Sequence, residues 1–226
     1  RTLKCSETGA VFHRSSSIWH KYKTKVMGAI QADGDTKNRR AKWNNGGPKT
    51  YTLTAGEDQI ELSQKNLGSA DVALLTAWLR RPEVRAALNS LTVDSTGNMK
   101  SQKTYTLTVG EDQIQLSEKN LGSADVALIA AWQQRPEVNA AITRVVLKGN
   151  FPCGRISKDG DGRAPWLPGK EFDGWNMLCE SFTKSTTLTD LDVSDCYLGP
   201  QALTPLTDAI KVMAALTEVD VRRNML

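Results

Sequence analysis

Long apolar segments, histidine clusters and catalytic motifs are all missing from this sequence of 226 residues. No run of about 18 apolar residues occurs, which excludes an apolar helix that spans a membrane. Only His13 and His20 are present, and neither lies near a nucleophile motif. The patterns G-x-x-x-x-G-K-S/T, G-x-S-x-G and G-x-G-x-x-G, which build phosphate, nucleophile and dinucleotide sites, do not occur in a fitting context. We therefore expect a non-catalytic protein without a cofactor.

Cysteine is scarce and scattered. The four residues Cys5, Cys153, Cys179 and Cys196 form no C-x-x-C pair. This spacing favours free thiols over a disulfide framework or a metal site, so we expect an intracellular, reducing compartment. The chain begins at Arg1 rather than Met, and the prediction therefore leaves open a targeting segment that has been removed.

Positive charge is concentrated near the amino terminus. Residues 1–50 carry 11 Lys or Arg and 3 Asp or Glu, whereas the remainder is mildly acidic. Residues 1–48 also do not fit the repeating pattern described below, so we predict a basic arm there. One short helix is expected from Ser17, because helical spacing relates Trp19, Tyr22, Val26 and Ile30. We expect the rest of the arm to be irregular.

The basic side chains of the arm are candidates for partner binding: Lys21, Lys23, Lys25, Arg39, Arg40 and Lys42. They are interleaved with aromatic residues such as Trp19 and Trp43, a combination that suits base stacking and phosphate contacts. The alternative is a solvated cap over one end of the repeat array, because runs of charge usually form solvated faces. Binding of nucleic acid or another anionic surface is kept as a third hypothesis for the function, and it predicts affinity that falls steeply with salt.

One apolar pattern occurs twice in tandem near the carboxyl terminus. Five positions of a segment that starts at Leu188 recur 28 residues later, from Leu216. The first set is Leu188, Leu191, Val193, Cys196 and Leu198, and the second is Leu216, Val219, Val221, Asn224 and Leu226. Both match the consensus L-x-x-L-x-L-x-x-N/C-x-L. The chain therefore resembles leucine-rich-repeat proteins, and the long helical segment between the matches resembles their ribonuclease-inhibitor type.

The resemblance implies an α/β leucine-rich-repeat solenoid, a horseshoe of short parallel strands with outer helices. Positions 4 and 6 of the consensus point inward, because side chains alternate along a strand. At position 9 a Cys or Asn side chain satisfies main-chain groups of the neighbouring loop. Between the two matches, Gly199 and Pro200 precede the helical spacing of Leu203, Leu206, Ile210 and Met213, which predicts the helix of one repeat.

Two near-copies of a longer unit precede these repeats. Residues 49–87 and 103–141 align without gaps and are identical at 31 of 39 positions. Each copy is expected to hold two strands of the horseshoe, and those of the first copy centre on Ile60 and Leu91. The alternating Lys-Thr-Tyr-Thr-Leu-Thr at the start of each copy predicts an additional hairpin strand.

Each copy also predicts two consecutive helices. In the first copy the longer helix follows Ser69 as its N-cap, and Pro82 separates it from a short second helix. Trp78 is expected in the core, as is its counterpart in the second copy. Leu79 is replaced by Gln133 in the second copy, so we expect this position to face water.

The spacing breaks at residues 151–170, a stretch rich in glycine and proline that we predict to be a surface loop. Within it, Asp159-Gly160-Asp161-Gly162 resembles the start of a calcium loop, but Arg163 stands where a third oxygen ligand is required. We expect a tight turn without a metal there, and we expect Trp166 to be a contact residue. The predicted organisation is an arm over 1–48 and a solenoid over 49–226, built from 49–102, 103–150, this insertion and 171–226.

In leucine-rich-repeat proteins, the exposed strand positions between the fixed leucines line the concave face and carry the function. The charged candidates are Arg144, Lys148, Asp190, Asp192, Asp195, Glu218, Asp220, Arg222 and Arg223. Such a surface suits a protein partner through charge complementarity. The first hypothesis is therefore a protein-interaction scaffold, and the alternative is a fixed structural subunit of a larger multiprotein complex.

Overall fold

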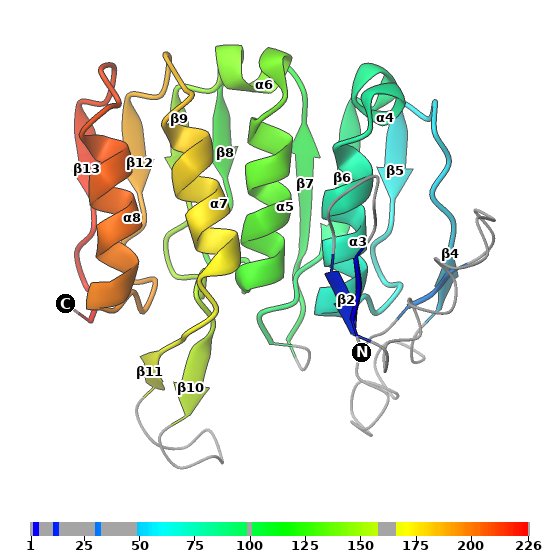
Figure 1. The fold of residues 1–226 in the computed structure, drawn as a ribbon, viewed down its shortest axis with the longest axis horizontal. Coiled ribbons are helices and arrows are strands. Elements are labelled where there is room, and N and C mark those ends of the chain that lie inside the picture. Colours follow the sequence, from blue (N-terminus) through cyan, green and yellow to red (C-terminus); the bar gives the residue numbers. More distant parts are fainter. Residues whose placement is uncertain are drawn as a thin grey trace.

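The structure is a computed structural model that describes residues 2–4, 11–13, 30–32, 49–98, 101–157 and 166–225. The architecture is mixed α/β, with strands and helices that alternate along most of the chain. The helices lie side by side over one face of the strands, so the described chain forms two layers (Figure 1). No described helix covers the opposite face of the strands, which we name the open face.

The larger sheet is parallel and has the strand order β13-β12-β9-β8. Its strands are β8 (Gln113–Gln115), β9 (Arg144–Val146), β12 (Asp190–Asp192) and β13 (Glu218–Asp220). In β12 the middle residue Leu191 is fully buried and both neighbours are half-buried. This alternation is what a strand with one face on a core and one face in water requires.

A second sheet contains β5 (Gln59–Glu61), β6 (Ser90–Asp94) and β7 (Thr104–Thr108). β5 is parallel to β6, whereas β7 is antiparallel to β6. β7 is the additional strand that the alternating segment predicted. In the described part of the chain no strand pairing joins β7 to β8, so the hydrogen-bond ladder is interrupted there, and Figure 1 shows these strands standing apart.

Four helices form the second layer, and each packs against the next. They are α3 (Ser69–Leu79), α5 (Ser123–Gln133), α7 (Asp173–Phe182) and α8 (Pro200–Ile210). The short helices α4 (Pro82–Ala87) and α6 (Pro136–Ala141) follow α3 and α5, as the prolines predicted. The predicted serine N-cap is wrong by one residue: Gly68 is the N-cap of α3, and its N–H donates to the Asp71 carboxylate over 2.9 Å.

The expectation that position 79 faces water is also wrong. Leu79 is 1% exposed and Gln133 is fully buried. The reason is that α5 lies between α3 and α7, so its flanks are covered as well as the face that rests on the sheet. The Gln133 Oε1 atom accepts a hydrogen bond from the Ser181 hydroxyl of α7 over 3.0 Å. Trp78 and its counterpart Trp132 are buried, as predicted.

Asparagine side chains hold the loops that follow the strands, as position 9 of the consensus predicted. Asn150 is fully buried, and its Nδ2 donates to the carbonyls of Leu116 and Leu147 over 2.7 Å each. Its Oδ1 accepts from the Leu121 N–H over 2.9 Å. Asn224 makes four equivalent hydrogen bonds of 2.8 to 3.0 Å in the loop after β13. Each loop is therefore tied to the segment beside it.

The same loops share one backbone conformation. The residue three places before the last consensus leucine, such as Gln64, Glu118 or Asp195, has a φ of 54 to 57°. Arg223 and Gly149 occupy equivalent positions, with φ values of 58° and 72°. Because a left-handed conformation is uncommon outside glycine, its recurrence at five places shows that these segments are structurally equivalent.

A buried tyrosine–aspartate pair occurs in each sequence copy. The Tyr51 hydroxyl donates to Asp71 over 2.8 Å, and the Tyr105 hydroxyl donates to Asp125 over 3.0 Å. Asp125 also accepts from the N–H and the hydroxyl of Thr96, each over 2.8 Å. Burial raises the pKa of Asp125 and raises the pKa of Tyr105 well above its usual range.

Short strands occur where the sequence predicted an irregular arm. β1 (Thr2–Lys4) pairs antiparallel with β2 (Val11–His13), and β3 (Ile30–Gln31) pairs antiparallel with β4 (Thr50–Tyr51). Ile30 therefore belongs to a strand and not to the predicted helix, whose other positions lie outside the described residues. A β-branched residue suits a strand that packs partly buried against the core, as Ile30 does.

The insertion at 151–170 contains a β-hairpin where the sequence predicted a loop. β10 (Arg155–Ser157) pairs antiparallel with β11 (Trp166–Pro168), and the hairpin projects beyond the two layers (Figure 1). The Arg155 guanidinium lies 3.8 Å from the ring centroid of Phe151 and 4.0 Å from that of Trp166. Such cation–π contacts stabilise the base of the hairpin. The segment that resembles a calcium loop lies outside the described residues.

Candidate protein-binding surface

The predicted charged side chains of the strands come together on the open face of β9, β12 and β13. Five of them lie on these strands: Arg144, Asp190, Asp192, Glu218 and Asp220. Four lie in the loops directly after the strands: Lys148, Asp195, Arg222 and Arg223. We name these nine residues the charged surface.

The register of the parallel sheet places like charges next to each other. Asp190 is opposite Glu218, and Asp192 is opposite Asp220. Neighbouring strands lie about 4.8 Å apart, and like charges at directly opposite positions repel each other. The core does not need charged side chains at these four outward-facing positions, because any polar residue would satisfy the fold there. Four carboxylates on two neighbouring strands therefore create a local negative potential that the fold itself does not need.

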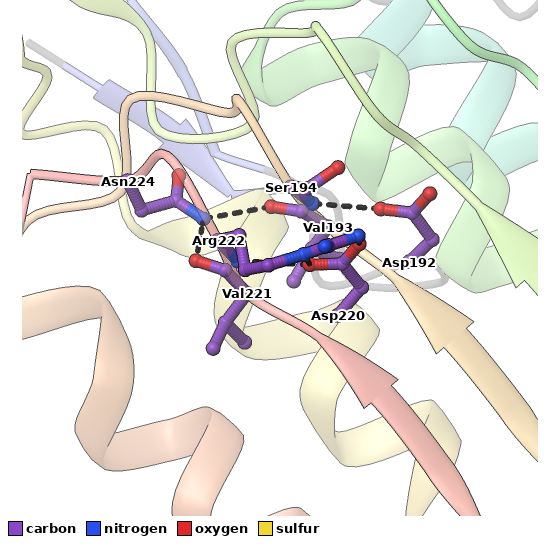
Figure 2. A network of polar contacts seen from close by, with 7 residues as sticks. All are labelled: Asp192, Val193, Ser194, Asp220, Val221, Arg222 and Asn224. Atoms are coloured by element: carbon purple, nitrogen blue, oxygen red, sulfur yellow. Dashed lines mark hydrogen bonds and ion pairs between the residues drawn. The ribbon is translucent and has the colours of Figure 1, made fainter.

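Two arginines offset part of this negative charge. The Arg222 guanidinium donates to both carboxylate oxygens of Asp220, from Nε over 3.0 Å and from Nη2 over 2.7 Å (Figure 2). These hydrogen bonds, together with one from the Arg222 main-chain N–H, lower the pKa of Asp220 to about 2. On the other side of β12, Arg144 Nε lies 3.2 Å from Asp190 Oδ2.

The acidic residue near the end of each strand also has a structural role that the sequence analysis missed. Asp192 accepts a hydrogen bond from the Ser194 N–H over 2.9 Å (Figure 2). Asp220 accepts a hydrogen bond from the Arg222 main-chain N–H over 3.0 Å, and Glu61 accepts one from the Ser63 N–H over 2.7 Å. The signal in the sequence is an acidic residue two places before a loop residue, a common turn arrangement.

Three carboxylates of the charged surface, those of Asp192, Asp195 and Glu218, form no ion pair in the described part of the chain, and two of them lie on the strands. Asp192 is half-buried and Glu218 is exposed. Lys148 and Arg223 are exposed in the loops after β9 and β13 and supply positive charge at the edge of the surface. The arrangement can therefore bind a partner that presents basic side chains opposite β12 and β13 and acidic ones at the loops.

The predicted contact residues of the arm and the insertion do not join the charged surface. The six basic residues of the arm lie outside the described residues: Lys21, Lys23, Lys25, Arg39, Arg40 and Lys42. Trp166 is half-buried in β11, where its ring stacks on Arg155. The same hairpin exposes Ile156 and Leu167, which are 41% and 39% exposed and stand opposite each other. The sequence analysis missed this apolar pair.

The three described thiols, those of Cys153, Cys179 and Cys196, are buried. Burial raises the pKa values of Cys153 and Cys196 to about 12, and it also raises the pKa of Cys179. The Cys196 thiol donates to the Leu147 carbonyl over 3.1 Å, so it takes the structural role of position 9. Among the described residues, no group of three His, Cys, Asp or Glu side chains is placed to hold a metal ion.

Comparison with models of known protein families and with curated proteins finds no match to this chain. None of the helices in the described ranges has both the length and the apolar character needed to cross a membrane. The function is therefore inferred from the geometry of the chain's own residues.

Proposed function

We propose that this chain is a leucine-rich-repeat protein of the ribonuclease-inhibitor-like type and acts as a non-catalytic protein-interaction scaffold. Three observations support the repeat assignment. Parallel strands alternate with helices, the loops after β5, β8, β9, β12 and β13 repeat one left-handed position, and Asn150 and Asn224 bond the same set of neighbouring main-chain groups. The open face of the sheet is then the concave face of the horseshoe.

The observation that carries the proposed function is the juxtaposition of carboxylates on the open face. Asp190 and Glu218, and Asp192 and Asp220, stand opposite each other, although the core does not require charge there. A basic partner surface would relieve this repulsion, so binding has a favourable electrostatic contribution already built into the free protein. The partner is therefore a protein with a patch of Lys or Arg side chains.

Reversal of one charge tests this proposal. Glu218 is exposed, forms no ion pair within the described residues and lies opposite Asp190, so Glu218→Lys should not lower stability and should weaken partner binding. Glu180→Lys is the control, because it makes the same charge change at an exposed site on α7; it also removes the 2.8 Å ion pair with Lys184, so the stability of both variants is measured first. Both variants and the original chain would be used to capture partners from an extract of the native source. Loss of partners with Glu218→Lys alone supports the proposal, whereas identical partners in all three captures would contradict it.

A second candidate function is that of a fixed subunit in a larger assembly. The exposed Ile156 and Leu167 on the projecting hairpin favour it, because an apolar pair on a protruding element suits a permanent interface. The native mass of the protein, isolated under gentle conditions together with any bound partners, distinguishes the two candidate functions. A complex of fixed stoichiometry would favour the subunit function if the double variant Ile156→Ser with Leu167→Ser no longer forms it. A monomer with transient partners would favour the scaffold function.

A further inference from the structure

A cavity of about 360 Å³ lies at the interruption between β7 and β8. Leu107, Ile114 and Trp132 contribute its apolar lining, and Thr106 and Gln115 are among the polar residues around it. The apolar side chains belong to the core between the sheet and the helices, and the polar ones are exposed on the open face. The interruption is therefore a groove with an apolar floor and polar rims.

One rim of the groove is a free strand edge of β7. The Val109 N–H donates to the Asn89 carbonyl over 2.9 Å, which shows that odd-numbered residues of this segment bond toward β6. Main-chain groups alternate in direction along a strand, so those of Thr106 and Thr108 point to the other side, toward β8.

The opposite rim is a free strand edge of β8. The Leu116 N–H donates to the Val146 carbonyl over 2.9 Å, so even-numbered residues bond toward β9. The main-chain groups of Gln113 and Gln115 consequently point toward β7. In the described part of the chain no main-chain hydrogen bond joins these two edges, and the main-chain groups of Thr106, Thr108, Gln113 and Gln115 offer donors and acceptors to the groove.

The first sequence copy repeats this feature. A cavity of about 280 Å³ is lined there by Thr52, Glu57, Ile60, Glu61 and Leu62, and the counterparts of all five line the second groove. The repetition indicates that the groove belongs to the duplicated unit and is not an accident of one loop.

The two ends of the second groove carry opposite charges. Glu111 lies in the turn that joins β7 to β8 and is exposed. At the other end, Lys119 Nζ donates to the Thr104 carbonyl over 3.2 Å, and Lys103 Nζ donates to the Glu118 carbonyl over 2.6 Å. A ligand that matches these ends has a basic residue near Glu111 and an acidic residue near the lysines.

We propose that this groove binds an extended peptide segment of a partner protein by strand addition. The main chain of the segment pairs with the free edges of β8 and β7, and alternate apolar side chains of the segment point to the floor formed by Leu107, Ile114 and Trp132. The proposal depends on the strand edges and the cavity, and it does not depend on the charged surface.

The test uses a labelled peptide, Lys-Val-Thr-Val-Thr-Val-Glu, and the whole chain. Saturable binding in fluorescence anisotropy is expected, together with slower hydrogen exchange of the main-chain amides in segment 104–116. The same peptide with N-methyl groups on alternate amides should bind at least about tenfold more weakly, because it cannot pair with a strand edge. Absence of binding up to about 1 mM would overturn the proposal, as would equal binding of the methylated peptide.

A pair of double variants tests the protein side. Glu61→Pro with Gln115→Pro removes one free edge N–H from each groove, at sites where the N–H is not used by the neighbouring strand. Peptide affinity should fall about tenfold or more. Glu61→Thr with Gln115→Thr loses the same side chains but keeps both N–H groups, so the proline variant should bind at least about tenfold more weakly than the threonine variant. Equal affinity of the two double variants, each shown to be folded by circular dichroism, would also overturn the proposal.

Discussion

The Tyr105 hydroxyl donates a 3.0 Å hydrogen bond to the Asp125 carboxylate, and both side chains are buried. This bond ties the additional strand β7 to the first turn of α5. Asp125 lies at the amino-terminal end of that helix, where a negative charge is favourable. The duplicated segment therefore contains the hydrogen bond that fixes β7, the strand that interrupts the parallel pattern, to the neighbouring helix.

Tyr105→Phe should destabilise the protein by about 1.5–3 kcal/mol, because it removes one hydrogen bond to a buried carboxylate. Unfolding in urea measures this change. Tyr197→Phe is the control, since the half-buried Tyr197 hydroxyl forms no hydrogen bond within the described residues. Equal stability of the Tyr105→Phe variant and the original chain would show that the hydrogen bond from Tyr105 to Asp125 does not contribute to the free energy of unfolding.

The stability should fall as pH rises above about 10, where tyrosine begins to ionise in the unfolded chain. Burial raises the pKa of Tyr105 well above that value in the folded chain, so only the unfolded chain releases the proton in this range. Below about pH 10 the contribution is fully present, and it is lost with a slope of up to about 1.36 kcal/mol per pH unit. Urea midpoints from about pH 9 to 11 should therefore decline less in Tyr105→Phe. Parallel curves for the two proteins would contradict the assignment.

Gln133→Leu should stabilise the protein by about 1 kcal/mol. The Nε2 atom of Gln133 is buried without a hydrogen-bond partner among the described residues, and the first copy already has Leu79 at this position. The reverse change, Leu79→Gln, should destabilise the protein and serves as the matched comparison. Thermal unfolding of both variants measures the effect, and a destabilised Gln133→Leu would mean that the bond from Ser181 is the stronger contribution.

Asn150→Ala should destabilise the protein by more than about 2 kcal/mol, because it leaves buried main-chain groups unpaired. Asn224→Ala removes the same kind of hydrogen bonds at a half-buried site, so its cost should be smaller. Urea unfolding of the two variants gives the comparison. A smaller effect at Asn150 than at Asn224 would contradict the idea that burial sets the cost.

The described thiols should resist modification in the folded protein. Burial holds the pKa values of Cys153 and Cys196 near 12 and raises that of Cys179, so almost no thiolate is present near neutral pH. In a Cys5→Ser background, Ellman's reagent should react slowly with the native chain. After unfolding in urea, three thiols should react quickly. Fast reaction of the native chain would indicate that one thiol is accessible.

The strands and helices of the repeats could be predicted because their signals are local and periodic. The spacing from Leu188 predicted β12, and Pro82 predicted the separation of α3 and α4. Alternation predicted the strand that became β7. In each case one chemical property of a few neighbouring residues decides the conformation, and tertiary packing agrees with it.

Other features could not be predicted because they depend on neighbours distant in sequence. Gln133 is polar, yet it is buried because α7 covers that side of α5. Arg155 lies between the rings of Phe151 and Trp166, and this contact helps to order a hairpin in a stretch whose glycines and prolines predict a loop. The nine charged residues were predicted as a set, but the ion pair of Arg144 with Asp190 depends on strand register.

The strand ladder is interrupted between β7 and β8, so the two sheets are joined there by helix packing, loop contacts and side-chain hydrogen bonds. In a stacked array, stability is a sum of the units and of the contacts between neighbours. At this boundary the helices α3 and α5 remain in contact, whereas no pairing joins the strands of the described chain. Because no strand pairing has to break there, we expect the main-chain amides of the β5, β6 and β7 sheet to exchange before those of the parallel sheet, once the contact of α3 with α5 and the bond from Tyr105 to Asp125 are lost.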